Sequence, residues 1–183
     1  GALGRVANTA ALQALAHVRN RDTARNLSLA SAEASLRAAE TLLDRGNRDT
    51  AAEIYVDLRG QRWPDHVRLG AFTGLLRARP DQAAQALISA ISSPDPLLRG
   101  TAIAHVDRLG GTDVTESLAQ ELPKLDAATQ ILLIDALAKT GRSASAAILK
   151  AGRMATGEVR AAAARALGRV GDASCVPWLA EVV

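Results

Sequence analysis

Residues 158–172 read EVRAAAARALGRVGD, and this stretch decides the fold. Four of its small or apolar residues recur at the spacing of one face of an α-helix: Ala163, Ala164, Leu167 and Val170. Gly171 is expected to end this helix, because glycine accepts the left-handed conformation that closes helices. Asp172 is then in position to cap the next helix. That helix is expected to begin within residues 175–179, where Pro177 falls in the first turn and is tolerated.

The chain repeats this pattern with a period near 31 residues. Three columns of like residues share one frame: Leu87, Leu118, Leu149 and Leu179; Leu75, Val106, Leu137 and Leu167; and Arg77, Arg108, Lys139 and Arg169. Members of the first column lie 31, 31 and 30 residues apart. A period of this length with helical texture inside each unit indicates a solenoid of helix pairs, in which each unit buries its apolar face against its neighbours. We therefore predict an all-α fold, a right-handed α-solenoid of about five antiparallel helix pairs.

Glycine, proline and aspartate between the helical stretches set the expected helix bounds. The first helices of successive pairs are predicted at residues 49–59, 81–91, 113–122, 143–153 and 174–183. The second helices are predicted from Pro64 to before Pro80, from Asp95 to Gly110-Gly111, from Asp126 to Thr140, and over 158–170. A longer helical stretch is predicted from about Thr23 to Arg45, ending at Gly46-Asn47. We predict a single domain over residues 1–183, irregular in 1–48 and regular, with repeats of about 31 residues, in 49–183.

Both ends of the chain fall inside the repeat pattern. Residues 2–6, ALGRV, repeat residues 166–170, and Leu15 then aligns with Leu179. Solenoids normally end in units with a polar outer face, and neither end of this sequence has one. We therefore expect either that the chain is a fragment of a longer array or that a partner covers its ends. A second copy of the chain, bound end to end, is one such partner.

Charge and composition exclude several classes of protein. The net charge is +3, from 22 basic and 19 acidic residues spread along the chain, which is too mild to predict nucleic-acid binding. Cys175 is the single cysteine, so an internal disulfide is excluded. No run approaches the roughly 18 apolar residues of a membrane span, and no secretory signal is visible, so we predict no membrane span. The compartment stays open.

Residues 158–172, followed by Val176-Pro177, resemble the HEAT-like repeat of the phycobilisome-lyase type. The signature of that repeat reads V-R-x-x-A-A-x-A-L-G-x-I-G-D and continues into a helix with A-V-P-x-L. The match is specific in this last unit, fair over residues 65–78 and 95–110, and weakest at 126–141, where Gln130 replaces the arginine. The chain is therefore identified as a bacterial-type HEAT-like repeat protein over about 65–183, with residues 2–18 as a partial unit.

The resemblance implies a HEAT-like, ARM-type superhelix whose second helices line a concave face. On this pattern the concave positions are Thr73, Arg77, Thr101, Ala104, Arg108, Asp135, Lys139, Arg165 and Arg169. Asp135 interrupts an otherwise positive strip. We predict a non-enzymatic interaction module or scaffold that binds a protein partner along this face and needs no cofactor. Two alternatives stay open: an accessory subunit of a lyase-type enzyme, and a weak binder of the nucleic-acid backbone.

The basic residues have a structural and a functional interpretation. The column Arg77, Arg108, Lys139 and Arg169 falls in the last turns of its helices, where positive charge complements the helix dipole. The same column could form a basic strip that receives an acidic peptide, phosphate or nucleic-acid backbone. The arginines that open second helices are Arg68, Arg99 and Arg160. We expect them to bond to loop carbonyls or to aspartates such as Asp65 and Asp95 rather than to an acidic ligand.

Residues typical of metal sites and catalysis do not form a pattern. The sequence has no His-Glu dipeptide, and its three histidines (His17, His66 and His105) occupy different repeat positions without zinc-type spacing to Cys175. We predict Cys175 to be a small buried residue rather than a nucleophile. Trp63 and Trp178 lie almost four repeats apart, so we expect Trp63 to plug a turn and Trp178 to pack in its repeat, not to stack on a nucleotide. We therefore predict neither a metal site nor an enzyme.

Overall fold

The computed structural model describes residues 9–20, 25–109 and 112–182. These residues form eleven α-helices and five short 3₁₀ helices, and no strand occurs among them, so the described chain is all-α as predicted. Contacts divide the chain into two compact units, residues 1–83 and 84–183, which we describe one at a time. Four predicted features lie outside the described residues: the repeat copy at residues 2–6, the stretch around Thr23, the helix end at Gly110-Gly111 and the last residue of the predicted 174–183 helix.

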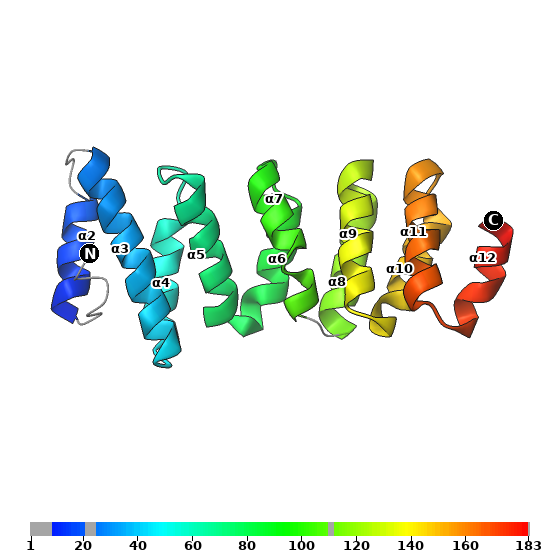
Figure 1. Ribbon diagram of the computed structural model, residues 1–183, viewed down its shortest axis with the longest axis horizontal. Coiled ribbons are helices and arrows are strands. Elements are labelled where there is room, and N and C mark those ends of the chain that lie inside the picture. The colour runs from blue at the N-terminus through cyan, green and yellow to red at the C-terminus, as the bar shows by residue number, and fades with distance from the viewer. Residues whose placement is uncertain (1–8, 21–24, 110–111, 183) are drawn as a thin grey trace. The chain divides into compact units, whose positions relative to one another are not determined.

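The first unit consists of four α-helices and one 3₁₀ turn (Figure 1). Their bounds are α2 Thr9–Asn20, α3 Arg25–Asp44, α4 Arg48–Leu58, α5 Asp65–Ala78 and η1 Pro80–Gln82. Each α-helix packs against the next, and α3 also packs directly against α5. The shared core holds many small side chains, among them Ala32, Ala38 and Ala39 of α3 and Ala51 and Ala52 of α4. Small side chains let helix axes approach closely, so this core is built from close packing and a few large residues.

Gly46 ends α3 as the sequence predicts. Its φ of 84° lies in the left-handed region that glycine occupies without a steric penalty. The Asn47 N–H donates to the Leu42 carbonyl at 2.9 Å, and the Gly46 N–H donates to the Leu43 carbonyl at 3.0 Å. These two bonds form a Schellman motif, which satisfies carbonyl groups that the end of the helix would leave without donors.

Tyr55 is the largest fully buried side chain of the first unit, and Gly74 makes room for it. A Cβ atom on Gly74 would overlap the Tyr55 ring, so only glycine fits between α5 and this ring. The Tyr55 hydroxyl has no hydrogen-bond partner among the described residues. Burial disfavours the phenolate and, with the Glu40 carboxylate nearby, raises the pKa of Tyr55 to about 12.

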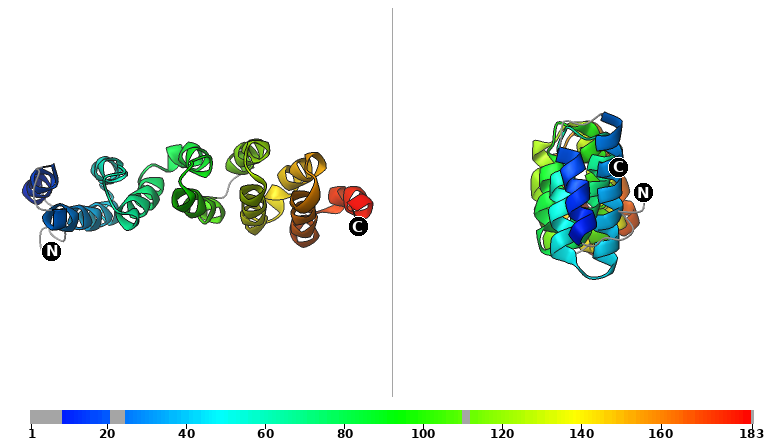
Figure 2. Two further views of the ribbon diagram at one scale, coloured as in Figure 1. Left: turned by 90° about the horizontal axis from the view of Figure 1, so that it is seen from above. Right: turned by 90° about the vertical axis from the view of Figure 1, so that its left-hand side faces the viewer.

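The second unit alternates longer helices with 3₁₀ turns. Its α-helices are α6 Ala83–Ile91, α7 Pro96–Ile103, α8 Thr112–Glu121, α9 Ala127–Lys139, α10 Ser145–Met154, α11 Gly157–Val170 and α12 Val176–Val182, with α6 beginning on the last residue of the first unit. The 3₁₀ turns are η2 Val106–Leu109, η3 Leu122–Lys124, η4 Arg142–Ala144 and η5 Ala173–Cys175. Within this unit α7 packs against α9 and α9 against α11, while α8 packs against α10 (Figure 2). The second helices of the predicted pairs are therefore neighbours in one row.

Aspartates open helices of the second unit as N-caps. Asp95 accepts hydrogen bonds from the backbone N–H groups of Leu97 and Leu98 at the start of α7. Asp126 accepts from the backbone N–H of Thr129 at 3.0 Å and from its hydroxyl at 2.7 Å. These bonds satisfy N–H groups that have no partner inside the helix. The Thr129 hydroxyl and N–H also hold the pKa of Asp126 below its usual value, because both bonds favour the charged carboxylate.

Gly171 follows α11 as predicted, but its expected conformation was wrong. Its φ of −64° and ψ of 163° are extended and not left-handed. Glycine is required there because a Cβ atom would lie 2.5 Å from the Leu167 carbonyl oxygen and 3.3 Å from the Cys175 side chain. Asp172 does cap the next turn, since its carboxylate accepts from the backbone N–H of Ser174 at 2.9 Å. The pKa of Asp172 is lowered, and the largest cause is the hydrogen bond that its carboxylate accepts from the Ser174 hydroxyl.

The predicted helix from Asp95 ends earlier than expected. α7 stops at Ile103, and the 3₁₀ turn η2 follows. The His105 ring nitrogen Nδ1 lies 2.8 Å from the Thr101 carbonyl oxygen, which is the acceptor that the His105 backbone N–H would use in an α-helix. That N–H donates to Ala102 instead, at 3.0 Å. The histidine side chain therefore replaces a backbone donor and tightens the chain into the 3₁₀ turn.

The other predicted helices are found within two residues of their expected bounds, where those bounds are described. Three first helices, at α6, α10 and α12, begin two residues late because the turns η1, η4 and η5 precede them. No described helix is both long enough and apolar enough to cross a bilayer. The single domain and the solenoid over the whole chain stay predictions.

Candidate functional site

A pocket of about 730 Å³ lies on the row formed by α7, α9 and α11 of the second unit. Gly100 and Ile103 of α7, with Ala104 just after it, form one side. Residues of α9 form the floor, and the last turn of α11 contributes Arg169 and Val170. A volume of this size is in the range of sites that bind small molecules or side chains of a partner.

Most of the pocket lining is apolar. Ile103, Leu132 and Val170 supply branched side chains, and Ala104, Ala136 and Ala138 supply small ones. Leu132 is 56% exposed, which is unusual for a large apolar residue in the middle of a helix that packs on both neighbours. An exposed apolar residue beside a hollow is a feature of interaction surfaces rather than of a core.

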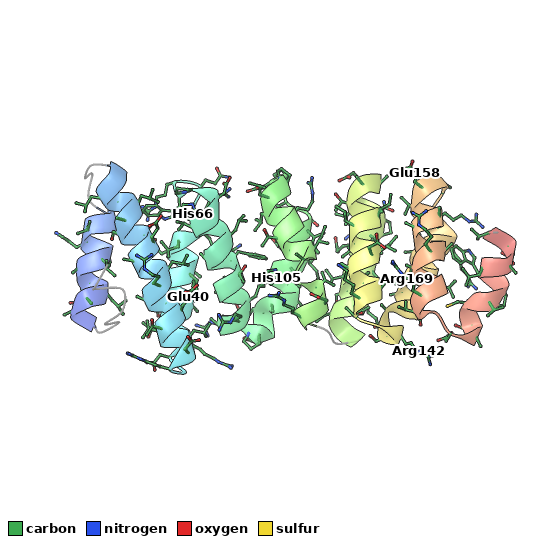
Figure 3. All side chains as sticks on the ribbon, viewed as in Figure 1. Glu40, His66, His105, Arg142, Glu158 and Arg169 are labelled. Atoms are coloured by element: carbon green, nitrogen blue, oxygen red, sulfur yellow. The ribbon has the colours of Figure 1, made fainter. Side chains whose placement is uncertain are left out.

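Three charged side chains share this pocket. The Arg169 Nη2 atom donates to the Asp135 Oδ1 atom at 2.8 Å, bridging α11 and α9, and Figure 3 shows Arg169 extending from α11 toward α9. Lys139 lies one helical turn after Asp135 on α9. The Arg169 and Asp135 side chains are 60% and 50% exposed, so their ion pair contributes on the order of 0–1 kcal/mol to stability. The pocket thus carries two cations and one anion at its polar end.

Four of the nine predicted concave positions line this pocket: Ala104, Asp135, Lys139 and Arg169. Arg108 and Arg165 belong to the same unit and are exposed, but they do not line it. The Thr101 hydroxyl donates to the Leu97 carbonyl of its own helix at 2.8 Å. Thr73 and Arg77 lie on α5 of the first unit.

Asp135 is the ion-pair partner of Arg169 and not only an interruption of a positive strip. The first unit contains the same arrangement, because Arg77 Nη2 of α5 lies 3.4 Å from Asp44 Oδ1 of α3. In each case the aspartate lies about one repeat before the arginine, 33 residues in the first pair and 34 in the second. The sequence analysis aligned the basic residues of successive repeats and did not identify the aspartates that pair with them. The separation of about one repeat between each aspartate and its arginine could have indicated these pairs.

The arginines that open second helices have local partners. Arg68 bonds to Asp65 at 2.6 Å, and Arg99 donates to the Ser93 carbonyl at 3.1 Å. Both contacts agree with the prediction that these arginines bond to nearby aspartates or loop carbonyls. Arg160 differs, because its guanidinium lies over the Trp178 ring, 5.8 Å from the ring centroid.

Residues considered for chemistry occupy packing positions. Cys175 and Trp178 are buried, and Trp178 packs against Gly152, as predicted for a small core residue and a repeat-filling tryptophan. Trp63 is buried in the turn before α5, and its Nε1 atom has no hydrogen-bond partner among the described residues. Within the described ranges no group of three or more His, Cys, Asp or Glu side chains could hold a metal ion.

Two further pockets of the second unit lie beside η3, one along α8 and α10 and the other along α9, α10 and the start of α11. One has a volume of about 430 Å³ and is lined by both Glu116 and Lys150, so its charges balance. The other, of about 320 Å³, has no charged lining residue. The charged residues that line these two pockets therefore sum to zero, whereas the pocket that contains Arg169 has one more basic than acidic lining residue.

No protein-family model and no curated protein sequence matches this chain. By its fold the chain belongs to the class of all-α proteins, on the residues that the structure describes. The resemblance to HEAT-like repeats stays a prediction based on the quoted sequence.

Proposed function

We propose that this chain is a HEAT-like α-solenoid that acts as a non-enzymatic module and binds a protein partner along its row of second helices. The repeat period of about 31 residues supports the proposal. The direct packing of α7, α9 and α11 in the second unit supports it as well, because a solenoid stacks each second helix on the next.

The observation that carries the proposal is the pocket around Arg169. It joins apolar lining with three charged side chains on the surface formed by α7, α9 and α11. Interfaces combine these features: an apolar centre supplies most of the affinity, and charges at the edge set orientation and specificity. Apolar Leu132 is the residue we expect a partner to cover.

A photo-crosslinking residue at position 132 tests the proposal. The same residue at Val176, which is exposed on α12 and outside the pocket, is the control. We expect one protein from the source cells to crosslink from position 132 and not from 176. That protein is then purified and its affinity for the full chain is measured.

Charge reversal links the captured protein to the pocket. We expect Lys139→Glu with Arg169→Glu to weaken binding at least tenfold, because hydrogen bonds to charged groups contribute about 1.5–3 kcal/mol each. Lys150→Glu, an exposed change on α10, should leave the affinity unchanged. Equal crosslinking from both positions, or binding that ignores the double reversal, refutes the proposal. Capture of nucleic acid with an affinity that falls steeply with salt would instead favour a backbone binder.

A further inference from the structure

We infer that the pocket around Arg169 takes an acidic segment of a partner that also carries a large apolar side chain, and that Asp135 competes with the partner's carboxylate for Arg169. This inference rests on the proposed function. It adds the chemistry of the partner and a residue of this chain that lowers the affinity for it.

The charge of the pocket determines the sign of its partner. Lys139 and Arg169 supply two positive groups against the single carboxylate of Asp135. Lys139 is the last residue of α9 and Arg169 the second-last of α11, so the negative ends of the two helix dipoles offset part of this positive charge. Lys139 has no ion pair among the described residues, so its ammonium group is available to an incoming carboxylate.

The apolar part of the pocket determines the second requirement. Leu132 and Ile103 border the hollow, and Val170 lies beside Arg169 at the end of α11. A branched or aromatic side chain placed there would cover Leu132, and removing this apolar surface from water favours binding. Lys139 lies seven residues, about two helical turns, after Leu132 on α9, so an acidic residue about two turns away in the partner would be in register with it. An amphipathic helix presents side chains at this spacing.

Asp135 already makes the contact that a partner's carboxylate would make. It holds the Arg169 guanidinium through one bond of 2.8 Å and lies one turn before Lys139 on the same helix. Because the pair is exposed, breaking it costs little, so Asp135 lowers the affinity for an acidic partner without preventing binding. Replacing this carboxylate with the amide of the same shape removes the competitor and leaves the pocket intact.

A display selection on the full chain tests the inference. The probe is a phage library of random short peptides, and the most enriched peptide is then synthesised with a fluorescent label for anisotropy titration. We expect enriched peptides to pair an acidic residue with a large apolar one. We expect Asp135→Asn to tighten the labelled peptide about 3- to 10-fold, and Lys139→Glu with Arg169→Glu to weaken it at least 10-fold.

Two control variants separate the local effect from net charge. Asp107→Asn changes the net charge by the same amount at an exposed position of η2 outside the pocket, and should leave the affinity within about twofold. Leu132→Ser removes the apolar contact and should abolish binding. All these positions are exposed or half-buried, and circular dichroism checks that each variant folds.

The outcomes distinguish the inference from the proposed function. Peptides that need Leu132 but show no acidic preference, or that bind no tighter to Asp135→Asn than to Asp107→Asn, overturn the inference and leave a binding pocket. A selection with no Leu132-dependent peptide also overturns it, while crosslinking of the intact partner from position 132 still decides the proposed function.

Discussion

Gly152→Ala is the substitution whose effect the structure specifies most sharply. An added Cβ atom would lie 2.7 Å from Trp178 Cη2, 2.9 Å from Trp178 Cζ2 and 2.9 Å from the Ala163 Cβ atom. Trp178 is 3% exposed, so its ring has no open space into which to move. Overpacking costs about 1–3 kcal/mol, and three contacts under 3.0 Å place this site in the upper part of that range, at about 2–3 kcal/mol. Alanine returns about 1 kcal/mol through its better helix propensity. We therefore expect a net destabilisation of about 1–2 kcal/mol.

Gly168→Ala is the matched control in the same unit. Gly168 lies inside α11, and an added Cβ atom there would meet nothing within 4 Å. The propensity gain then acts alone, so this variant should be more stable than the parent by about 0.5–1 kcal/mol. The two glycine-to-alanine changes thus have opposite predicted signs for one stated reason, the space around the new methyl group.

Urea titration followed by tryptophan fluorescence measures both effects. In a Trp63→Phe background Trp178 is the single tryptophan and reports on the second unit. A double-mutant cycle with Trp178→Phe, read by far-ultraviolet circular dichroism, should show coupling to Gly152→Ala of at least about 0.5 kcal/mol. A Gly152→Ala variant as stable as its parent, or a Gly168→Ala variant destabilised by the same amount, would refute the packing argument.

Three further predictions concern single residues. Near-ultraviolet absorbance should show that Tyr55, the one tyrosine, ionises near pH 12. The contribution of the neutral Tyr55 side chain to the free energy of unfolding is complete below its ordinary pKa of 10.0 and is lost as pH rises toward 12. Tyr55→Phe should remove this pH dependence of stability. The hydrogen bond from the Thr129 hydroxyl is the largest cause of the lowered pKa of Asp126. Ionised Asp126 therefore stabilises the fold above its ordinary pKa of 3.8, and this contribution is lost as pH falls through the folded pKa. Asp126→Asn should make stability less dependent on pH in the acid range. Asp95→Ala removes the cap of α7 and should lower the free energy of unfolding by about 0.5–2 kcal/mol, whereas an unchanged urea midpoint would show that the cap is dispensable.

Helix positions could be predicted because each depends on local signals. Apolar periodicity locates the buried face, and glycine, proline or aspartate locates the end, as at Gly46 and Asp126. The predicted end of the helix that begins at Asp95 was wrong because a side-chain hydrogen bond interrupts the backbone pattern there. His105 takes over a carbonyl that a continuing helix would use, and no periodic pattern records such a substitution of one donor for another.

Gly171 shows a second limit of local signals. The sequence requires a glycine there, and the prediction explained it by the left-handed conformation that glycine commonly takes after a helix. The structure explains it by the approach of the Leu167 carbonyl and the Cys175 side chain to the missing Cβ atom. Both reasons forbid a side chain at the same residue, so the sequence alone cannot distinguish them.

The candidate site was predictable as a set of positions but not as a set of contacts. The repeat frame grouped Ala104, Asp135, Lys139 and Arg169, which line one pocket, because residues one period apart lie on neighbouring helices of one row. It could not show that Leu132 is exposed beside them, since apolar residues of a helix are expected in the core. Exposure depends on which neighbours cover the helix, and that information is tertiary.

The ion pair of Asp135 and Arg169 has more bearing on binding than on stability. Arg169 already gains from the dipole of α11 without any aspartate, and an exposed pair adds on the order of 0–1 kcal/mol. The bond does orient the guanidinium toward α9, although the side chain stays 60% exposed. A fixed cation loses less conformational entropy when it meets a carboxylate, while the carboxylate that fixes it must be displaced. On the proposed function we therefore expect Asp135 to raise the selectivity of the pocket for acidic groups and to lower its affinity for them, and Asp135→Asn should separate these two effects by tightening binding while broadening the set of peptides that bind.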